Sequence, residues 1–208
     1  LDVRIDLEFA DESAMLNLDV GDEGQTLLWT KANADILQED GAVSLNWEGS
    51  LRMRGMVPGM RCKQVAKRLP AIGNDLRGRA SLDLLGHGKA CNPDLRLVAA
   101  MDTPVGVNGE RIRLDIEAIR TGDEVDLVTT VEQGNRRFMK VWASLSTHLG
   151  AVMEAVLKDG AEVDLSDTDA WLDSFQANIA LNNADLGQLA RMADVGHPLE
   201  GTMGGGVH

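Results

Sequence analysis

The sequence contains no tyrosine, and only three phenylalanines and four tryptophans among its 208 residues. Aromatic residues make up 3% of the chain and apolar residues 44%, so we expect an aliphatic core and aliphatic binding surfaces. Basic residues are also in short supply, with 20 Lys and Arg against 33 Asp and Glu, and the formal net charge is −13. A nucleic-acid binder needs a basic surface that attracts phosphates. This balance therefore argues against a nucleic-acid partner.

Long hydrophobic runs are missing as well. The longest uninterrupted apolar run covers five residues, Leu97 to Met101, whereas a membrane-spanning helix needs about 20. The chain begins at Leu1, without a methionine and without a basic-then-apolar leader. We therefore expect residues 1–208 to form a single elongated β domain that is a fragment of a longer protein.

Motifs of enzymes and of metal or cofactor sites are missing too. The sequence has no nucleophile elbow, phosphate-binding loop or zinc helix, and we predict neither an enzyme nor a metal or cofactor site. Its two cysteines, Cys62 and Cys91, would close a loop of about thirty residues as a disulfide worth roughly 3 kcal/mol, or remain separate thiols. A zinc site at these cysteines has only His87 nearby, whereas about four ligands are needed.

The dominant pattern is an alternation of apolar and polar residues, which is typical of strands with one buried face. The longest alternating run extends from Val43 to Val57. Turn residues separate the runs, for example at Asp40-Gly41 and Thr121-Gly122-Asp123. The sequence therefore predicts a mainly β fold with a long antiparallel meander. The other runs are Val3–Phe9, Leu16–Val20, Leu82–Leu84, Leu95–Leu97, Ile112–Ile116, Val125–Leu127, Val141–Leu145, Val163–Leu165 and Ala177–Leu181.

A few short helices accompany the strands in this prediction. Helical spacing or capping residues indicate them at Lys63–Leu69, Leu149–Leu157, Ser166–Trp171 and Asp185–Met192. Two of them belong to an internal repeat, in which residues 188–203 align without gaps on residues 65–80 and a strand follows each Leu-x-Gly. Repetition at such a long period favours an elongated, stacked architecture.

The remaining feature is a long aliphatic face shared by many strands. One interpretation is an ordinary sandwich core, in which two sheets cover each other. The other is a sheet curled lengthwise around an open hydrophobic groove, which glycines within strands would permit at Gly49 and Gly55. The candidate groove-lining residues are Val43, Leu45, Trp47, Leu51, Met53, Leu82, Leu84, Leu95, Leu97, Ile112, Leu114, Ile116, Val125 and Leu127.

Two stretches resemble the TamB family, the translocation and assembly module subunit related to AsmA-like and bridge-type lipid transporters. They are Val65 to Met101, which contains Leu-x-Gly-x-x-x-Leu-x-Leu, a glycine turn and Pro-x-Leu, and Asp185 to His208. The resemblance implies a sheet folded into a β-taco around a hydrophobic groove. It also implies location in the Gram-negative periplasm within a protein anchored in the inner membrane, a partner barrel of the TamA type, and phospholipid transport between membranes that supports outer-membrane biogenesis.

Physical chemistry is compatible with this expectation. Moving an acyl chain into water costs roughly 0.8 kcal/mol per methylene, so its passage requires a continuous apolar track. We expect the net negative charge to keep lipid head groups in water at the open edge. Two alternatives remain: a chaperone-like module that binds strands of outer-membrane protein clients by β-augmentation, and a periplasmic β scaffold with a closed core.

Overall fold

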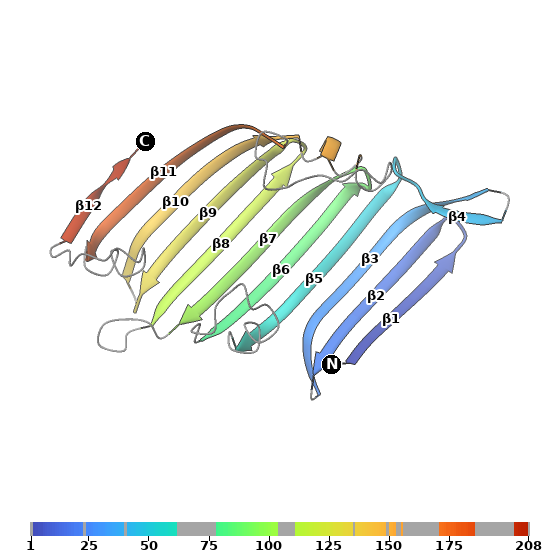
Figure 1. The fold of residues 1–208 in the computed structure, drawn as a ribbon, viewed down its shortest axis with the longest axis horizontal. Coiled ribbons are helices and arrows are strands. Elements are labelled where there is room, and N and C mark those ends of the chain that lie inside the picture. Colours follow the sequence, from blue (N-terminus) through green and yellow to red (C-terminus); the bar gives the residue numbers. More distant parts are fainter. Residues whose placement is uncertain are drawn as a thin grey trace.

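The computed structural model describes residues 2–22, 24–39, 41–61, 78–103, 111–134, 136–148, 150–152, 155, 171–185 and 202–207. These residues form a twelve-stranded antiparallel sheet (Figure 1). The fold is therefore mainly β, as the alternating patterns predicted. The strands are β1 (Asp2–Ala10), β2 (Ser13–Asp22), β3 (Gln25–Glu39), β4 (Ala42–Leu45), β5 (Ser50–Arg61), β6 (Arg79–Lys89), β7 (Asn92–Thr103), β8 (Ile112–Thr121), β9 (Glu124–Gln133), β10 (Arg136–Thr147), β11 (Leu172–Asp185) and β12 (Thr202–Val207).

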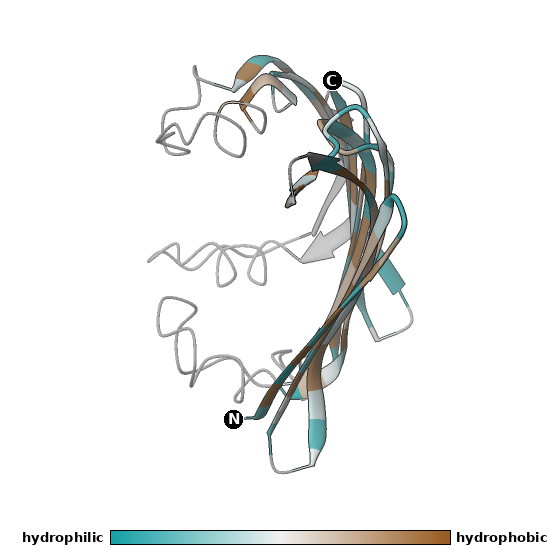
Figure 2. Ribbon diagram, turned by 90° about the vertical axis from the view of Figure 1, so that its right-hand side faces the viewer, coloured by the Kyte–Doolittle hydropathy of each residue, from teal (hydrophilic) through white to brown (hydrophobic). Residues whose placement is uncertain are grey.

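The strands lie side by side in chain order. The order is β1-β2-β3-β5-β6-β7-β8-β9-β10-β11-β12, and β4 pairs only with β3, beside this path. β1 and β12 form opposite edges of the sheet, so the sheet is not closed into a barrel. Viewed from the side, the strands are bowed rather than flat (Figure 2).

Tight turns with glycine join several neighbouring strands. Gly122, between β8 and β9, has φ of 60°, and Gly134, between β9 and β10, has φ of 57°. Side chains rarely adopt such positive φ values, whereas glycine does so without steric cost. The sequence predicts the turn at Thr121-Gly122-Asp123, and the structure confirms it.

One long strand was not expected from the sequence. β3 follows the glycine turn at Gly24 and runs for 15 residues. Its alternation is carried on one face by small or weakly apolar side chains, Thr30, Ala32 and Ala34. These residues differ little in hydropathy from the polar residues between them, so the alternation along β3 is too weak to predict a strand.

The predicted continuous run from Val43 to Val57 is wrong, because residues 46–49 form a turn between β4 and β5. The Asn46 side chain accepts hydrogen bonds through Oδ1 from the backbone N–H groups of Glu48 (3.2 Å) and Gly49 (3.1 Å). Asp35 of β3 then accepts from the Ser50 backbone N–H at 2.7 Å and so holds the start of β5. A local side-chain hydrogen bond thus replaces strand pairing here.

Helical structure is described at residues 150–152 and 155, within the predicted helix Leu149–Leu157. There the Val152 backbone N–H donates to the His148 carbonyl at 3.0 Å. The predicted helix Lys63–Leu69 lies outside the described residues, as do Val163–Leu165 and most of the repeat at 65–80 and 188–203. Of the predicted helix Ser166–Trp171, Trp171 alone is described; it lies in a turn, and β11 begins at the next residue, Leu172. Asp185, predicted to begin a helix, ends β11. β6 and β12 begin at equivalent positions of the repeat, Arg79 and Thr202.

The chain has an unusually large surface. It exposes 13891 Å², whereas a compact monomer of the same mass exposes about 9,400 Å². Among the described residues, the buried apolar side chains are few: Leu27, Ile36, Ala90, Pro93, Ile112, Val131 and Ala143. This surface and this small core are typical of a single sheet rather than of two sheets that cover each other.

Candidate functional site

One face of the sheet is almost entirely apolar across its whole width. We call it the apolar face and define it by strand register. One row of directly opposed residues crosses ten strands from β1 to β11, and threonine is its single polar member. The row consists of Ile5, Leu18, Thr30, Gly55, Leu84, Leu97, Ala118, Leu127, Ala143 and Ala177.

Two neighbouring rows of directly opposed residues are also mainly apolar. From β5 to β11, a second row comprises Val57, Leu82, Ala99, Ile116, Thr129, Val141 and Ile179. From β6 to β11, a third comprises Ala80, Met101, Leu114, Val131, Met139 and Leu181. Because successive residues of a strand point to opposite faces, the alternation seen in the sequence becomes a continuous aliphatic surface once the strands pair in register.

Most of the predicted groove-lining residues lie together on the apolar face. They are Leu51, Met53, Leu82, Leu84, Leu95, Leu97, Ile112, Leu114, Ile116, Val125 and Leu127. The other three, Val43, Leu45 and Trp47, do not join them. Val43 and Leu45 lie on β4, which pairs only with β3, and Trp47 lies in the turn before β5. The Asn46 turn separates these three residues from the main sheet.

The apolar face extends further than the sequence-based selection. On β1, the side chains of Val3, Ile5, Leu7 and Phe9 belong to it and remain 55%, 63%, 53% and 55% exposed. Near the opposite edge of the sheet, Phe175 and Ile179 of β11 also belong to the apolar face. Their alternation was visible in the sequence and would have identified them, had every alternating strand been included.

Burial of the apolar face is deepest near one end of β8 and β9. Ile112 is 5% exposed and Val131 2%, and Leu114, Met139 and Leu181 pack against them. Exposure rises toward both edges, to 63% at Ile5 on β1 and 59% at Phe175 on β11. The described residues thus present a broad aliphatic surface that is half-buried along its central strands, buried at Ile112 and Val131 near one end of β8 and β9, and open at β1 and β11.

The opposite face, which we call the polar face, carries charges in cross-strand pairs. Arg96 contacts Glu117 at 2.8 Å, and Arg54 contacts Asp83 at 3.2 Å. On β8, Arg113 bonds Asp115 at 2.8 Å, and this hydrogen bond, aided by charge attraction, raises the pKa of Arg113 above its ordinary value. These side chains are more than a third exposed, so their pairs contribute little stability. These ion pairs show that this face of the sheet is exposed to solvent.

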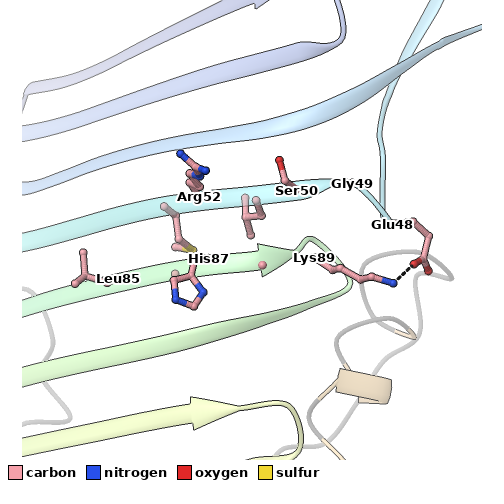
Figure 3. A pocket seen from close by; sticks show the side chains of 11 residues that line it. Glu48, Gly49, Ser50, Arg52, Leu85, His87 and Lys89 are labelled. Carbon is pink, nitrogen blue, oxygen red and sulfur yellow. Dashed lines mark hydrogen bonds and ion pairs between the residues drawn. The ribbon is translucent and has the colours of Figure 1, made fainter.

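A hollow of about 720 Å³ opens at one end of β5 and β6 (Figure 3). Its apolar side is formed by Leu51, Met53 and Gly86. A Cβ atom on Gly86 would lie 2.5 Å from Cγ of Met53 and 3.0 Å from Cδ2 of Leu95. The glycine therefore lets Met53 lie close over the backbone of β6.

Lys89 lies at the rim of this hollow. Its Nζ contacts Glu48 at 2.8 Å, as the dashed line in Figure 3 shows. The hydrogen bond from Lys89 to Glu48, with their charge attraction, raises the pKa of Lys89 above 10.5. This ion pair links the end of β6 to the turn before β5.

The residues considered for metal or redox chemistry are dispersed. Within the described ranges, no group of three or more His, Cys, Asp and Glu residues could hold a metal ion. His87 and His148 lie beside Asp94 (3.7 Å) and Asp173 (2.7 Å), respectively, whereas His197 and His208 fall outside the described residues. Cys91 is a free, half-buried thiol, and Cys62, its possible disulfide partner, lies outside the described residues.

The part of the chain that the structure describes contains no helix long and apolar enough to cross a membrane. No protein-family model, curated protein or solved structure matches the chain. Its function is therefore inferred from the geometry of the apolar face.

Proposed function

We propose that the chain carries phospholipid acyl chains along its apolar face, as a periplasmic segment of a TamB-like protein that connects the inner and outer membranes and supports outer-membrane biogenesis. The observation that supports this proposal is the mainly aliphatic surface that crosses the sheet from β1 to β11, with Thr30 as the single polar member of its longest row. Apolar patches of monomeric proteins are usually smaller than a few hundred Å². A surface of this extent is suited to a long apolar ligand.

The form of the sheet supports the same proposal. Adjacent strands are separated by about 4.8 Å, so the eleven strands that lie side by side span about 50 Å. Each methylene kept out of water contributes roughly 0.8 kcal/mol, and a track without charged side chains at its centre offers the same environment at every step. A curled, taco-like sheet would place this face on the inside, with head groups near the open edge. A TamA-type barrel would then be the partner of the full-length protein.

The proposal can be tested by site-specific photocrosslinking in cells labelled with radioactive phosphate. A photoreactive amino acid is placed at Leu114, which lies between Met101 and Val131 on the apolar face. The matched control is Arg113, the preceding residue, which lies on the polar face between Asp102 and Glu132. Labelled phospholipid captured at Leu114 and absent at Arg113 would support the proposal. If Leu114, Ile112 and Ile116 all failed to capture lipid, the proposal would be rejected.

A second candidate function is favoured by the open edge at β1, which pairs only with β2. An edge strand offers unpaired backbone groups to an additional strand. The exposed Val3, Ile5 and Leu7 would then contact the apolar residues of an outer-membrane protein client. Hydrogen exchange distinguishes this function, because an added client strand would slow the exchange of β1 amides, whereas lipid would leave the backbone edge open. The closed-core scaffold finds less support, since β1 and β12 do not meet.

A further inference from the structure

Arg120 on β8 is the one charged side chain that is fully buried among the described residues, with 4% exposure. It stands on the apolar face, directly opposite Leu95 of β7 and Val125 of β9. The row in which it lies is otherwise aliphatic from Leu95 back to Met53 and from Val125 on to Leu145. A permanent positive charge thus interrupts a surface made of hydrocarbon.

Among the described residues, no acidic side chain forms an ion pair with Arg120. Nη1 donates to the Pro93 carbonyl at 2.7 Å, and Nη2 donates to Oδ1 of Asn92. Both acceptors are neutral. Nε is buried and has no hydrogen-bond partner in the part of the chain that the structure describes. Asp94 of β7 accepts from the Gly122 backbone N–H at 3.2 Å, and Asp123, whose Oδ1 lies near the Asn92 side chain, forms no ion pair with Arg120.

A guanidinium stays protonated in proteins, and burying a charge without an opposite charge is unfavourable. An oxyanion would remove this cost, because arginine forms short, charge-assisted hydrogen bonds to carboxylates and phosphates through two adjacent N–H groups. The unpartnered Nε supplies one such donor. The second N–H groups of the Nη atoms supply others.

We infer that the ligand of the apolar face is an anionic amphiphile whose carboxylate or phosphate oxygens bind Arg120 while its alkyl chain lies against Leu95, Leu97 and Leu127. This inference rests on the proposed function and names the chemistry of its ligand. The sequence-based expectation was that every head group stays in water. In this inference, the oxyanion of the ligand instead binds the buried guanidinium of Arg120. The aliphatic surroundings of Arg120 select an amphiphile rather than a free anion.

The test compares two ligands of the same chain length on the delipidated, full 208-residue chain. Laurate carries a carboxylate and lauryl alcohol a neutral hydroxyl, and both are titrated calorimetrically at a pH at which laurate is ionised. We expect laurate to bind at least about tenfold more tightly, as is typical of a hydrogen bond to a charged group. Equal affinities would overturn the inference and leave the proposed function intact. Failure of both ligands to bind would overturn both.

Two variants on β8 test whether Arg120 causes the preference for laurate over lauryl alcohol. In Arg120→Gln, which keeps hydrogen-bonding capacity but loses the charge, the preference for laurate should disappear, while affinity for lauryl alcohol stays within about twofold. Arg113→Gln, on the polar face of the same strand, should keep the preference. A preference retained in Arg120→Gln would overturn the inference. Circular dichroism verifies that both variants fold.

A measurement on the unsubstituted chain covers the case in which Arg120→Gln does not fold. The Nε–H signal of a buried arginine is observed by nitrogen-15 NMR, and laurate should shift the Arg120 signal whereas lauryl alcohol should not. An unchanged signal at saturating laurate would overturn the inference. As a final control, acetate and inorganic phosphate are titrated in the same way as laurate. If either bound as tightly as laurate, the site would be one for free anions, and the amphiphile would be excluded.

Discussion

At the scale of single residues, glycine decides how closely side chains approach the sheet. Gly86 is buried on the apolar face, directly opposite Met53 on β5 and Leu95 on β7. The Met53 side chain fills the space that a Cβ atom of residue 86 would occupy. Met53 can therefore pack against the backbone of β6 only because residue 86 has no side chain.

We predict that Gly86→Ala lowers the free energy of unfolding by about 1–3 kcal/mol, the usual range for overpacking, because Met53 must move. In a Met53→Ala background, the same change should cost less than half as much, since the 2.5 Å contact is removed and only the 3.0 Å contact with Leu95 remains. Urea denaturation of the four proteins of this double-mutant cycle measures both values. Equal costs in the two backgrounds would show that Met53 is not the obstacle.

The Lys89–Glu48 pair provides a second prediction at this scale. Because the pKa of Lys89 is raised in the folded chain, its contribution to stability is fully present below the ordinary lysine pKa. That contribution is lost only as the pH rises through the higher folded value. An NMR titration of the lysine Cε signals should show Lys89 titrating above its ordinary value, and Glu48→Gln should lower the pKa of Lys89. If Lys89 titrated identically in the Glu48→Gln variant, the cause assigned to Glu48 would be wrong.

At the scale of secondary-structure elements, one turn determines which strands belong to the main sheet. The Asn46 turn ends β4 after its pairing with β3, and Asp35 holds the start of β5 through the Ser50 backbone. β5 then pairs with an earlier part of β3, at Trp29 to Ala34. A single long strand thereby pairs with two successive partners, and the β3–β4 hairpin projects beyond the sheet (Figure 1).

We expect Asn46→Ala to destabilise the chain by about 1 kcal/mol, the typical contribution of a hydrogen bond, because two backbone N–H groups lose their shared acceptor. Asn46→Asp keeps an oxygen at the same position and should cost less. Urea midpoints of the three proteins provide the comparison. If alanine and aspartate had the same effect, the side-chain oxygen would not be responsible for the turn.

At the scale of the whole molecule, a sheet with one aliphatic face has an apolar surface available for a ligand. The chain exposes 13891 Å², well above the roughly 9,400 Å² of a compact monomer of its mass. Its stability should therefore be linked to whatever covers that face, because a ligand that binds only the folded state stabilises it by mass action.

We predict that a short-chain phospholipid at about a hundred times its Kd raises the free energy of unfolding by about 2.7 kcal/mol. Glycerophosphate, which carries the head-group phosphate without acyl chains, should have no such effect. Urea denaturation of delipidated chain with each compound measures the difference. An unchanged midpoint at saturating phospholipid would show that the folded chain does not bind it.

Much of the fold could be predicted from the sequence where the alternation involved large side chains. Val3–Phe9, Ile112–Ile116 and Val141–Leu145 all lie within strands, because a contrast between aliphatic and charged neighbours is strong. β3 escaped prediction because Ala32 and Ala34 give weak contrast. Trp47 was misplaced because the alternation continues through residues that Asn46 turns away from the sheet.

The sequence by itself determined that the chain is mainly β, that its strands follow one another through glycine turns, and that each strand has an aliphatic face. These are local properties, set by side-chain alternation along one strand and by the φ angles that glycine permits. The tertiary structure alone decided how the faces join, since strand register depends on hydrogen bonds between distant segments. It also placed Arg120, which ends an ordinary alternating run in the sequence, as a buried cation among the side chains of β7, β8 and β9.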